Sequence, residues 1–225
     1  MNFTFLAIDI FLLLIPFLLS LDKNVLGKAY LKFSLGAALV SAIVFSAEMA
    51  FLKIFSVVNY HFDYFLSFNY KELPLTQYLF NFAFSFAALG VYHYLHIRFP
   101  KNDLQKFSLT LSNLLLGICV AFLFFAYGKW YSLLTFSSLF LLLLFIEYLN
   151  KLRFMYKAYR AFAAMFIPFC ICAIFLEKQG IVTFNQAETL KLTFLTVPLE
   201  SYFMALSMVV LSIYMFEFFK HRAAK

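Results

Sequence analysis

Three carboxylates in apolar surroundings are the residues of this sequence with the clearest potential for chemistry. Asp9, Glu48 and Glu200 lie within long apolar runs or at their ends. An ionised group is costly inside a bilayer and is usually retained there for a purpose. Because an apolar setting disfavours the charged form, such a carboxyl group can stay protonated and act as an acid. The competing interpretations are interfacial anchoring for Glu200 and pairing with buried polar groups for Asp9 and Glu48.

Polar side chains also recur at helical spacing in three of the apolar runs, which predicts inward-facing stripes. The alternative is a structural role, in which these side chains join neighbouring helices through hydrogen bonds. The stripes are Gln77, Asn81 and Ser85; Glu200, Met204 and Ser207; and Ser34, Ser41 and Glu48.

The sequence gives little support for a metal site, a disulfide or a nucleotide-binding site. His93 and His96 are three residues apart, as two metal ligands can be, but no third ligand is evident and an interfacial belt explains them better. The three cysteines lie in apolar runs, where free cysteine behaves as a small hydrophobe. The six glycines are scattered and form no phosphate-binding loop. We therefore expect no metal and no cofactor.

The composition defines a membrane protein. Hydrophobic residues make up 64% of the chain and charged residues only 13%, whereas soluble domains carry about a quarter of their residues as charges. Runs of about 20 apolar residues span a bilayer as helices. No basic residue precedes the first run, which favours a retained helix over a signal peptide. The sequence predicts an all-α fold with seven spans: 3–21, 30–54, 74–97, 107–127, 129–149, 157–176 and 197–219.

The basic residues predict the orientation in the membrane. Thirteen of the 18 Lys and Arg residues flank the loops after the first, third and fifth spans or lie in the tail. The positive-inside rule then places the amino terminus outside and the carboxyl terminus in the cytoplasm. This topology accounts for the net charge of +7, so we expect membrane lipid and no nucleic acid as a partner.

Two matching helix starts suggest an internal duplication. Pro74-Leu75 and Pro198-Leu199 are 124 residues apart, and each opens an apolar run. Superposing them predicts a single membrane domain, 1–225, in a 3+1+3 arrangement of two parallel repeats. The repeats are 1–97 and 129–225, and 98–128 is the linking helix. The alternative is that apolar helices resemble one another by composition alone.

The motifs around the second helix start resemble those of the integral-membrane lycopene cyclase domain of bacterial, archaeal and fungal carotenoid cyclases. The segment from Val182 to Glu188, followed by Pro198-Leu199-Glu200, is the best match. The resemblance implies protonation of a terminal double bond of lycopene, ring closure and proton loss, an isomerase reaction without net redox. It suggests Glu200 as the first candidate acid and Glu48 as the second. The candidates for binding or orienting the substrate are Gln77, Asn81, Ser201 and Glu188.

The resemblance also has departures. Thr76-Gln77 and Ser201 stand where the family carries motif acids, and Ala47-Glu48 stands where it usually has Trp-Asp. The resemblance implies a carotenoid or other polyprenoid as substrate, a partner cyclase subunit or a homodimer, and the inner membrane of a bacterium. The lost acids leave a second hypothesis, a non-catalytic polyprenoid-binding or accessory protein. A small-solute transporter is the third, because parallel three-helix repeats also build transporters.

Overall fold

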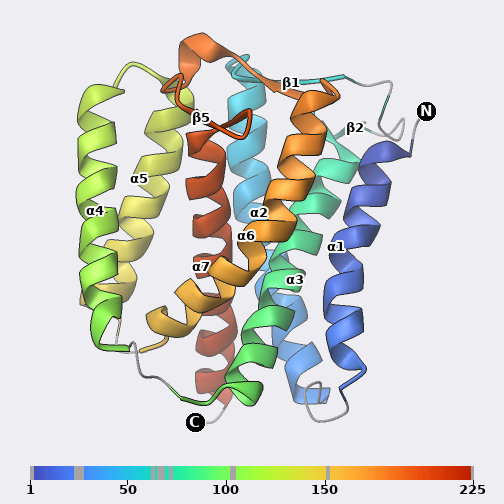
Figure 1. Ribbon diagram of the computed structural model, residues 1–225, viewed down its shortest axis with the longest axis vertical. Helices are drawn as coiled ribbons and strands as arrows, with labels where there is room; N and C mark the ends of the chain where they lie inside the picture. The colour runs from blue at the N-terminus through green and yellow to red at the C-terminus, as the bar shows by residue number, and fades with distance from the viewer. Residues whose placement is uncertain are drawn as a thin grey trace.

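Seven α-helices account for most of this computed structural model, which describes residues 3–22, 28–61, 64, 69–70, 73–101, 105–150 and 153–223. The helices run side by side along the long axis (Figure 1). Four basic residues used to predict the topology, Lys23, Lys71, Lys151 and Lys225, lie outside the described residues. Each predicted span contains one helix. The helices are α1 (Thr4–Ser20), α2 (Lys28–Ile54), α3 (Leu75–Arg98), α4 (Ser108–Phe125), α5 (Trp130–Leu144), α6 (Met155–Lys178) and α7 (Leu199–Ala223).

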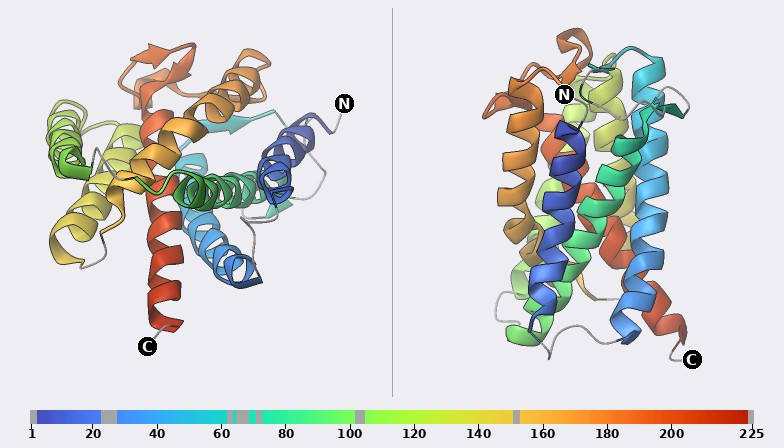
Figure 2. Two further views of the ribbon diagram at one scale, coloured as in Figure 1. Left: turned by 60° about the horizontal axis from the view of Figure 1, so that its bottom comes forward. Right: turned by 90° about the vertical axis from the view of Figure 1, so that its right-hand side faces the viewer.

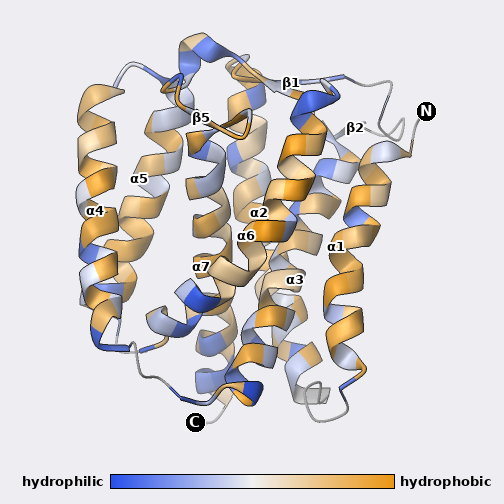
Figure 3. Ribbon diagram, viewed as in Figure 1, coloured by the Kyte–Doolittle hydropathy of each residue, from blue (hydrophilic) through white to orange (hydrophobic). Residues whose placement is uncertain are grey.

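Five of these segments are long and apolar enough to cross a membrane. The helix α1 is apolar but has only 17 residues, and α3 is long but is not among the five. Apolar residues dominate the middle of the bundle, and polar residues gather toward its two ends (Figure 3). The prediction of an all-α membrane protein is therefore confirmed. The five segments are Tyr30–Ile54, Gln105–Phe125, Trp130–Leu149, Met155–Lys178 and Leu199–Ala223.

The helices α3 and α7 are the central elements of the bundle (Figure 2). Each packs against both α2 and α6, while α1 lies along α3 and α5 lies along α7. The approach of α1 to α3 depends on a glycine, because a Cβ at Gly90 would lie 2.9 Å from the Cβ of Pro16. The two central helices therefore each contact helices from both halves of the chain.

Short strand pairs, which the sequence analysis did not predict, organise the loops at one end of the bundle. In the first pair, β1 (Val58–Tyr60) runs antiparallel to β4 (Val182–Phe184) and joins the loops after α2 and α6. Two hairpins then lead into the central helices: β2 (Asn69–Tyr70) with β3 (Leu73–Pro74), and β5 (Thr193–Phe194) with β6 (Val197–Pro198). Both prolines singled out in the sequence therefore end a strand and precede a helix.

The two halves share detailed backbone geometry at the offset of 124 residues. Ser56 and Gly180 both have positive φ, 55° and 64°, and end α2 and α6 in the same kind of turn. The hydroxyl of Tyr78 donates to the carbonyl of Tyr70 at 3.0 Å. The hydroxyl of Tyr202 donates to the carbonyl of Phe194 at 2.8 Å, 124 positions later.

Short helical turns complete the chain between the main helices. They are η2 (Gln105–Phe107) before α4, the π-helical turn η3 (Phe145–Leu149) that continues α5, and the 3₁₀ turn η4 (Gln186–Glu188) after β4.

A buried polar cluster attaches α4 to the rest of the bundle. Among the described residues of α4, only Ser112 and Cys119 are buried. The hydroxyl of Ser112 donates to the carboxylate of Glu147 in η3 and lies 2.7 Å from the hydroxyl of Tyr159 in α6. Arg153 lies 3.9 Å from the other oxygen of Glu147. Ser112 therefore joins α4 to both η3 and α6, and a second hydrogen bond, from Tyr148 of η3 to Asn113 at 2.6 Å, also holds α4 to η3.

We expect Ser112→Val to destabilise the protein because it leaves the buried Glu147 and the half-buried Tyr159 without their shared partner. The expected loss is about 1–3 kcal/mol, seen as a lower thermal midpoint of the detergent-solubilised protein. Thr110→Val, on the exposed side of α4, is the matched control and should leave the midpoint unchanged. Equal midpoints for the two variants would show that the cluster does not hold α4 in place.

Candidate functional site

An aromatic cavity of about 80 Å³ lies where the two halves of the chain meet. It is bounded mainly by α3, α6 and α7, with two residues from β4 and single residues from α1, α2, α5 and β6. Several equivalent positions of the two halves line it together, including Gln77 with Ser201 and Asn81 with Ala205. The cavity is therefore placed at the interface of the halves. Its aromatic walls are Phe5, Phe80, Tyr131, Phe169 and Phe184.

Two buried amides form one side of the cavity. The side-chain nitrogen of Gln77 donates to the side-chain oxygen of Asn81 at 3.1 Å, and the nitrogen of Asn81 donates to Ser46 of α2 at 3.0 Å. One turn further along, Ser85 donates to Ser41 at 3.2 Å. The stripe predicted on α3 therefore faces inward, and its hydrogen bonds also join α3 to α2.

Tyr131 lies at the centre of the polar groups around the cavity. Its hydroxyl is 2.8 Å from the hydroxyl of Ser201, and its ring stacks on Phe184 with centroids 5.0 Å apart. The carboxylates of Glu200, Glu177 and Glu48 all act electrostatically on this phenol. Tyr131 is fully buried, so these electrostatic interactions are poorly screened by water.

The outer strands add a second buried phenol close to this centre. Tyr60 of β1 interacts electrostatically with Tyr131, and burial raises the pKa of Tyr60 well above its usual value. Tyr60 therefore stays neutral and provides no charge near the cavity.

Glu200, the first candidate acid, is fully buried but does not line the cavity. One oxygen of its carboxylate accepts from the hydroxyl of Ser132 at 2.7 Å and from the backbone N–H of Leu190 at 2.5 Å. The residue lies in the first turn of α7, where the helix dipole favours negative charge. Glu200 therefore joins α5 and the outer loop to the start of α7.

Glu188 also makes structural contacts in the outer loop. Its carboxylate accepts from the backbone N–H of Trp130 at 2.9 Å, at the beginning of α5. The neighbouring Lys129 donates to the carbonyl of Thr189 at 2.7 Å. Glu188 therefore caps α5, and it does not line the cavity.

The other two carboxylates considered in the sequence lie outside the cavity lining. Glu48 is half-buried in α2 and interacts with the hydroxyl of Ser138 on α5. Asp9 is fully buried in α1 and acts electrostatically on Cys172 of α6. Neither carboxylate is among the residues that line the cavity.

Of the predicted site residues, the cavity brings together Gln77, Asn81 and Ser201. Sequence reasoning missed two of its polar residues, Tyr131 and Glu177. Glu177 follows the last apolar residues of a predicted span and belongs to none of the polar stripes. The sequence signal for Glu177 is that an acidic residue directly follows an apolar span.

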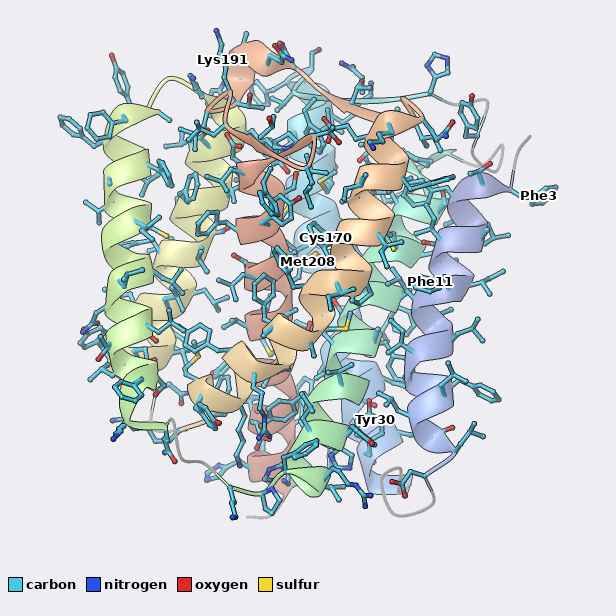
Figure 4. The ribbon with its side chains drawn as sticks, in the orientation of Figure 1. Phe3, Phe11, Tyr30, Cys170, Lys191 and Met208 are labelled. Atoms are coloured by element: carbon cyan, nitrogen blue, oxygen red, sulfur yellow. The ribbon has the colours of Figure 1, made fainter. Side chains whose placement is uncertain are left out.

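The histidines at the opposite end of the bundle contact aromatic rings. His93 stacks on Tyr30 with ring centroids 4.6 Å apart, and Tyr30 lies at that end of the bundle in Figure 4. His96 stacks on Tyr92, 6.4 Å away. Within the described part of the chain, no three His, Cys, Asp or Glu side chains are grouped closely enough to hold a metal ion.

These features define a polytopic all-α membrane protein with an aromatic and polar cavity at the interface of its halves. A profile of the lycopene cyclase family matches residues 2–95 and 128–219. The chain therefore belongs to the lycopene cyclase family. Comparison with curated proteins finds no match, and neither does comparison with solved structures.

We expect Glu200→Ala to loosen the loop between β4 and β5. The substitution removes the acceptor for Ser132 and for the backbone N–H of Leu190, at a cost of about 1–3 kcal/mol for each buried donor left unpaired. Lys191 lies in this loop, at the top of the molecule in Figure 4, and is exposed. Trypsin should therefore cleave after Lys191 faster in the variant.

The control is Glu217→Ala at the other end of α7, where the carboxylate accepts from Tyr92. Cleavage after Lys191 should be unchanged in this variant. If Glu200→Ala is cleaved no faster than the unmutated protein, Glu200 does not hold the loop.

Proposed function

We propose that the chain is a lycopene-cyclase-type isomerase that closes the end group of a linear carotenoid by acid-initiated cyclisation. The observation that carries the proposal is the aromatic cavity at the interface of the halves, in a chain of this family. A proton adds to the terminal double bond, the resulting cation closes the ring, and loss of another proton gives the cyclic end group. No net redox change occurs, and no cofactor enters the reaction.

The cavity walls suit a cationic intermediate. Aromatic faces attract a cation through their quadrupole and offer no nucleophile to trap it. Exclusion of water also prevents capture of the cation by hydroxide or water. Five aromatic rings and the apolar side chains of α7, including Met204 and Met208, provide these surroundings.

The cavity has to enlarge when a substrate enters. Its volume of about 80 Å³ equals only about three water molecules at their volume in the liquid. A carotenoid end group is larger, so binding requires neighbouring helices or the outer strands to move apart. The rest of the extended polyene then lies between helices or in the lipid.

We also propose that the fold is a tandem repeat, with 1–97 and 129–225 as repeats and 98–128 as the linking helix, in one membrane domain. Support comes from the hydrogen bonds that recur at an offset of 124 residues and from the two segments that the family profile matches. All seven helices would then cross the membrane, in a 3+1+3 arrangement with the amino terminus outside. The proposed location is the bacterial inner membrane.

A non-catalytic carotenoid-binding or accessory protein is the second candidate function. The observation that favours it is the pair of hydrogen bonds to Glu200, which commit the only remaining motif acid to a structural contact. Thr76, Gln77 and Ser201 replace the other motif acids. Such a protein would bind the polyene in the same cavity without converting it.

Reporter fusions test the topology. Fusions after Lys106 and after Lys225 should both report a cytoplasmic location, because both positions belong to the basic side of the protein. A fusion that exposes a reporter after Asn59, in the opposite loops, should report the outside. An external signal at either of the first two positions would contradict the orientation and the parallel repeats.

Pigment analysis tests the activity. A lycopene-accumulating host that expresses the chain should produce monocyclic or bicyclic carotenoids, separated by chromatography. Asn81→Leu should lower the yield by about 100-fold per membrane-inserted protein, because it removes the amide pair and fills the cavity, so that the end group is misplaced.

The matched control is Asn113→Leu on the exposed face of α4, which should keep the yield of the unmutated chain. Absence of any cyclic product from the unmutated chain, with and without a partner cyclase subunit, would reject the isomerase proposal. Retention of lycopene by the purified protein would then support the accessory function.

A further inference from the structure

Glu177 is the one carboxylate among the residues that line the cavity. It lies in the last turn of α6, just before the turn at Gly180. Tyr131 and Tyr202 are both within range of its electrostatic influence. A carboxyl group at this position faces the space in which the proposed reaction would take place.

The surroundings of Glu177 favour the protonated acid. The negative end of the α6 dipole disfavours a carboxylate in the last turn of the helix. One of its oxygens, Oε2, is buried and has no hydrogen-bond donor among the described residues. No ion pair to Glu177 occurs within 4.0 Å in the described part of the chain. A neutral carboxylic acid avoids the cost of a buried and uncompensated charge.

Glu200 differs from Glu177 in its position and in the contacts of one oxygen. Its Oε2 is also buried without a hydrogen-bond donor among the described residues, but two donors, from Ser132 and Leu190, converge on its Oε1. Glu200 does not line the cavity, so its carboxyl group joins α5 and the loop before β5 to the start of α7.

The position of Glu177 also allows its proton to be replaced. The residue is half-buried and lies in the last turn of α6, just before the loop that leads to β4. Its neighbours along the chain, Lys178 and Gln179, are exposed. One side of the carboxyl group thus faces the cavity, while the adjacent backbone reaches the surface.

We propose that Glu177 is the catalytic acid of the cavity, an inference that rests on the cyclase function proposed above. Its carboxylic acid gives a proton to the terminal carbon–carbon double bond and becomes a carboxylate. The carbocation forms the ring carbon–carbon bond, and the carboxylate then accepts the proton lost from the ring. The acid is regenerated, and neither an oxidant nor another reactant is required.

The equivalent position in the first half does not provide a second acid. Lys53 occupies the position in the first half that is equivalent to Glu177, 124 residues earlier. Its ammonium group donates to the side-chain oxygen of Asn59 at 3.5 Å. The cavity therefore has a proton donor on one side and the amides Gln77 and Asn81 on the other. This difference distinguishes Glu177 from the motif acids, which recur in both halves of the family pattern.

Substitutions compare the two glutamates directly. Glu177→Gln should reduce cyclic product per membrane-inserted protein by about 100-fold or more, the range expected for loss of a general acid, without lowering the thermal midpoint. Glu177→Asp should retain measurable activity.

Glu200→Gln should lower the amount of folded protein but keep the yield per folded molecule, and Glu217→Gln at the far end of α7 is the control. Unchanged product from Glu177→Gln would overturn the assignment.

Chemical labelling provides a readout that does not require turnover. The apolar reagent dicyclohexylcarbodiimide modifies protonated carboxyl groups in apolar surroundings, and mass spectrometry locates the adduct. Glu177 should be labelled and Glu200 should not, and added lycopene should slow the labelling of Glu177. Labelling of Glu200 with none at Glu177 would overturn the proposal even if the chain proves inactive. Labelled Glu177 in a chain that forms no product would instead reject only the cyclase function.

Discussion

The pairing of β1 with β4 is the constraint on which the cavity depends. The turn at Ser56 ends α2, the turn at Gly180 ends α6, and the two following strands meet with Asn59 opposite Thr183. This ladder fixes the distance between the ends of α2 and α6. The hairpins that follow then deliver α3 and α7 into the gap between those helices. The ladder thus acts together with the direct packing of α3 on α7 and of both on α2 and α6, and the residues at the starts of α3 and α7 face one cavity.

Helix ends determine what each glutamate can do in this fold. Glu200 in the first turn of α7 interacts with the positive end of the helix dipole, and Glu177 in the last turn of α6 interacts with the negative end. The same rule applies at the end of α3, where Arg160 donates to the carbonyls of Leu95 and Phe99 at 2.8 and 2.9 Å. For a charged residue near a helix terminus, the role therefore depends on whether the residue lies in the first or the last turn, and not on the residue type alone. The effect at a single helix end is modest, about 0.3–1 kcal/mol and at most about 2 kcal/mol, so it acts together with the hydrogen bonds around each carboxyl group.

Much of the fold could be predicted from the sequence, because apolar runs near 20 residues leave helices as the main option in a bilayer. The inward direction of Gln77 and Asn81 followed from their spacing. The strands did not, since β2 and β5 have only two residues each. The exclusion of Glu200 from the cavity lining was also beyond the sequence. Adjacent residues on a helix differ by about 100° in direction, so Ser201 faces the cavity while Glu200 faces α5 and the loop.

The difference between Glu177 and Lys53 gives a reason for two halves to be carried in one chain. In a symmetric dimer of a single half, an acid at this position would occur twice, on both sides of a cavity of about 80 Å³. Two carboxyl groups so close together cannot both ionise, and one proton would be shared between them. A single chain joined through α4 avoids this coupling, because each half can keep the packing while its cavity residues change independently. In the proposed mechanism, the similar backbones of the two halves would form the enclosure, and their different side chains would place the acid on one side of it.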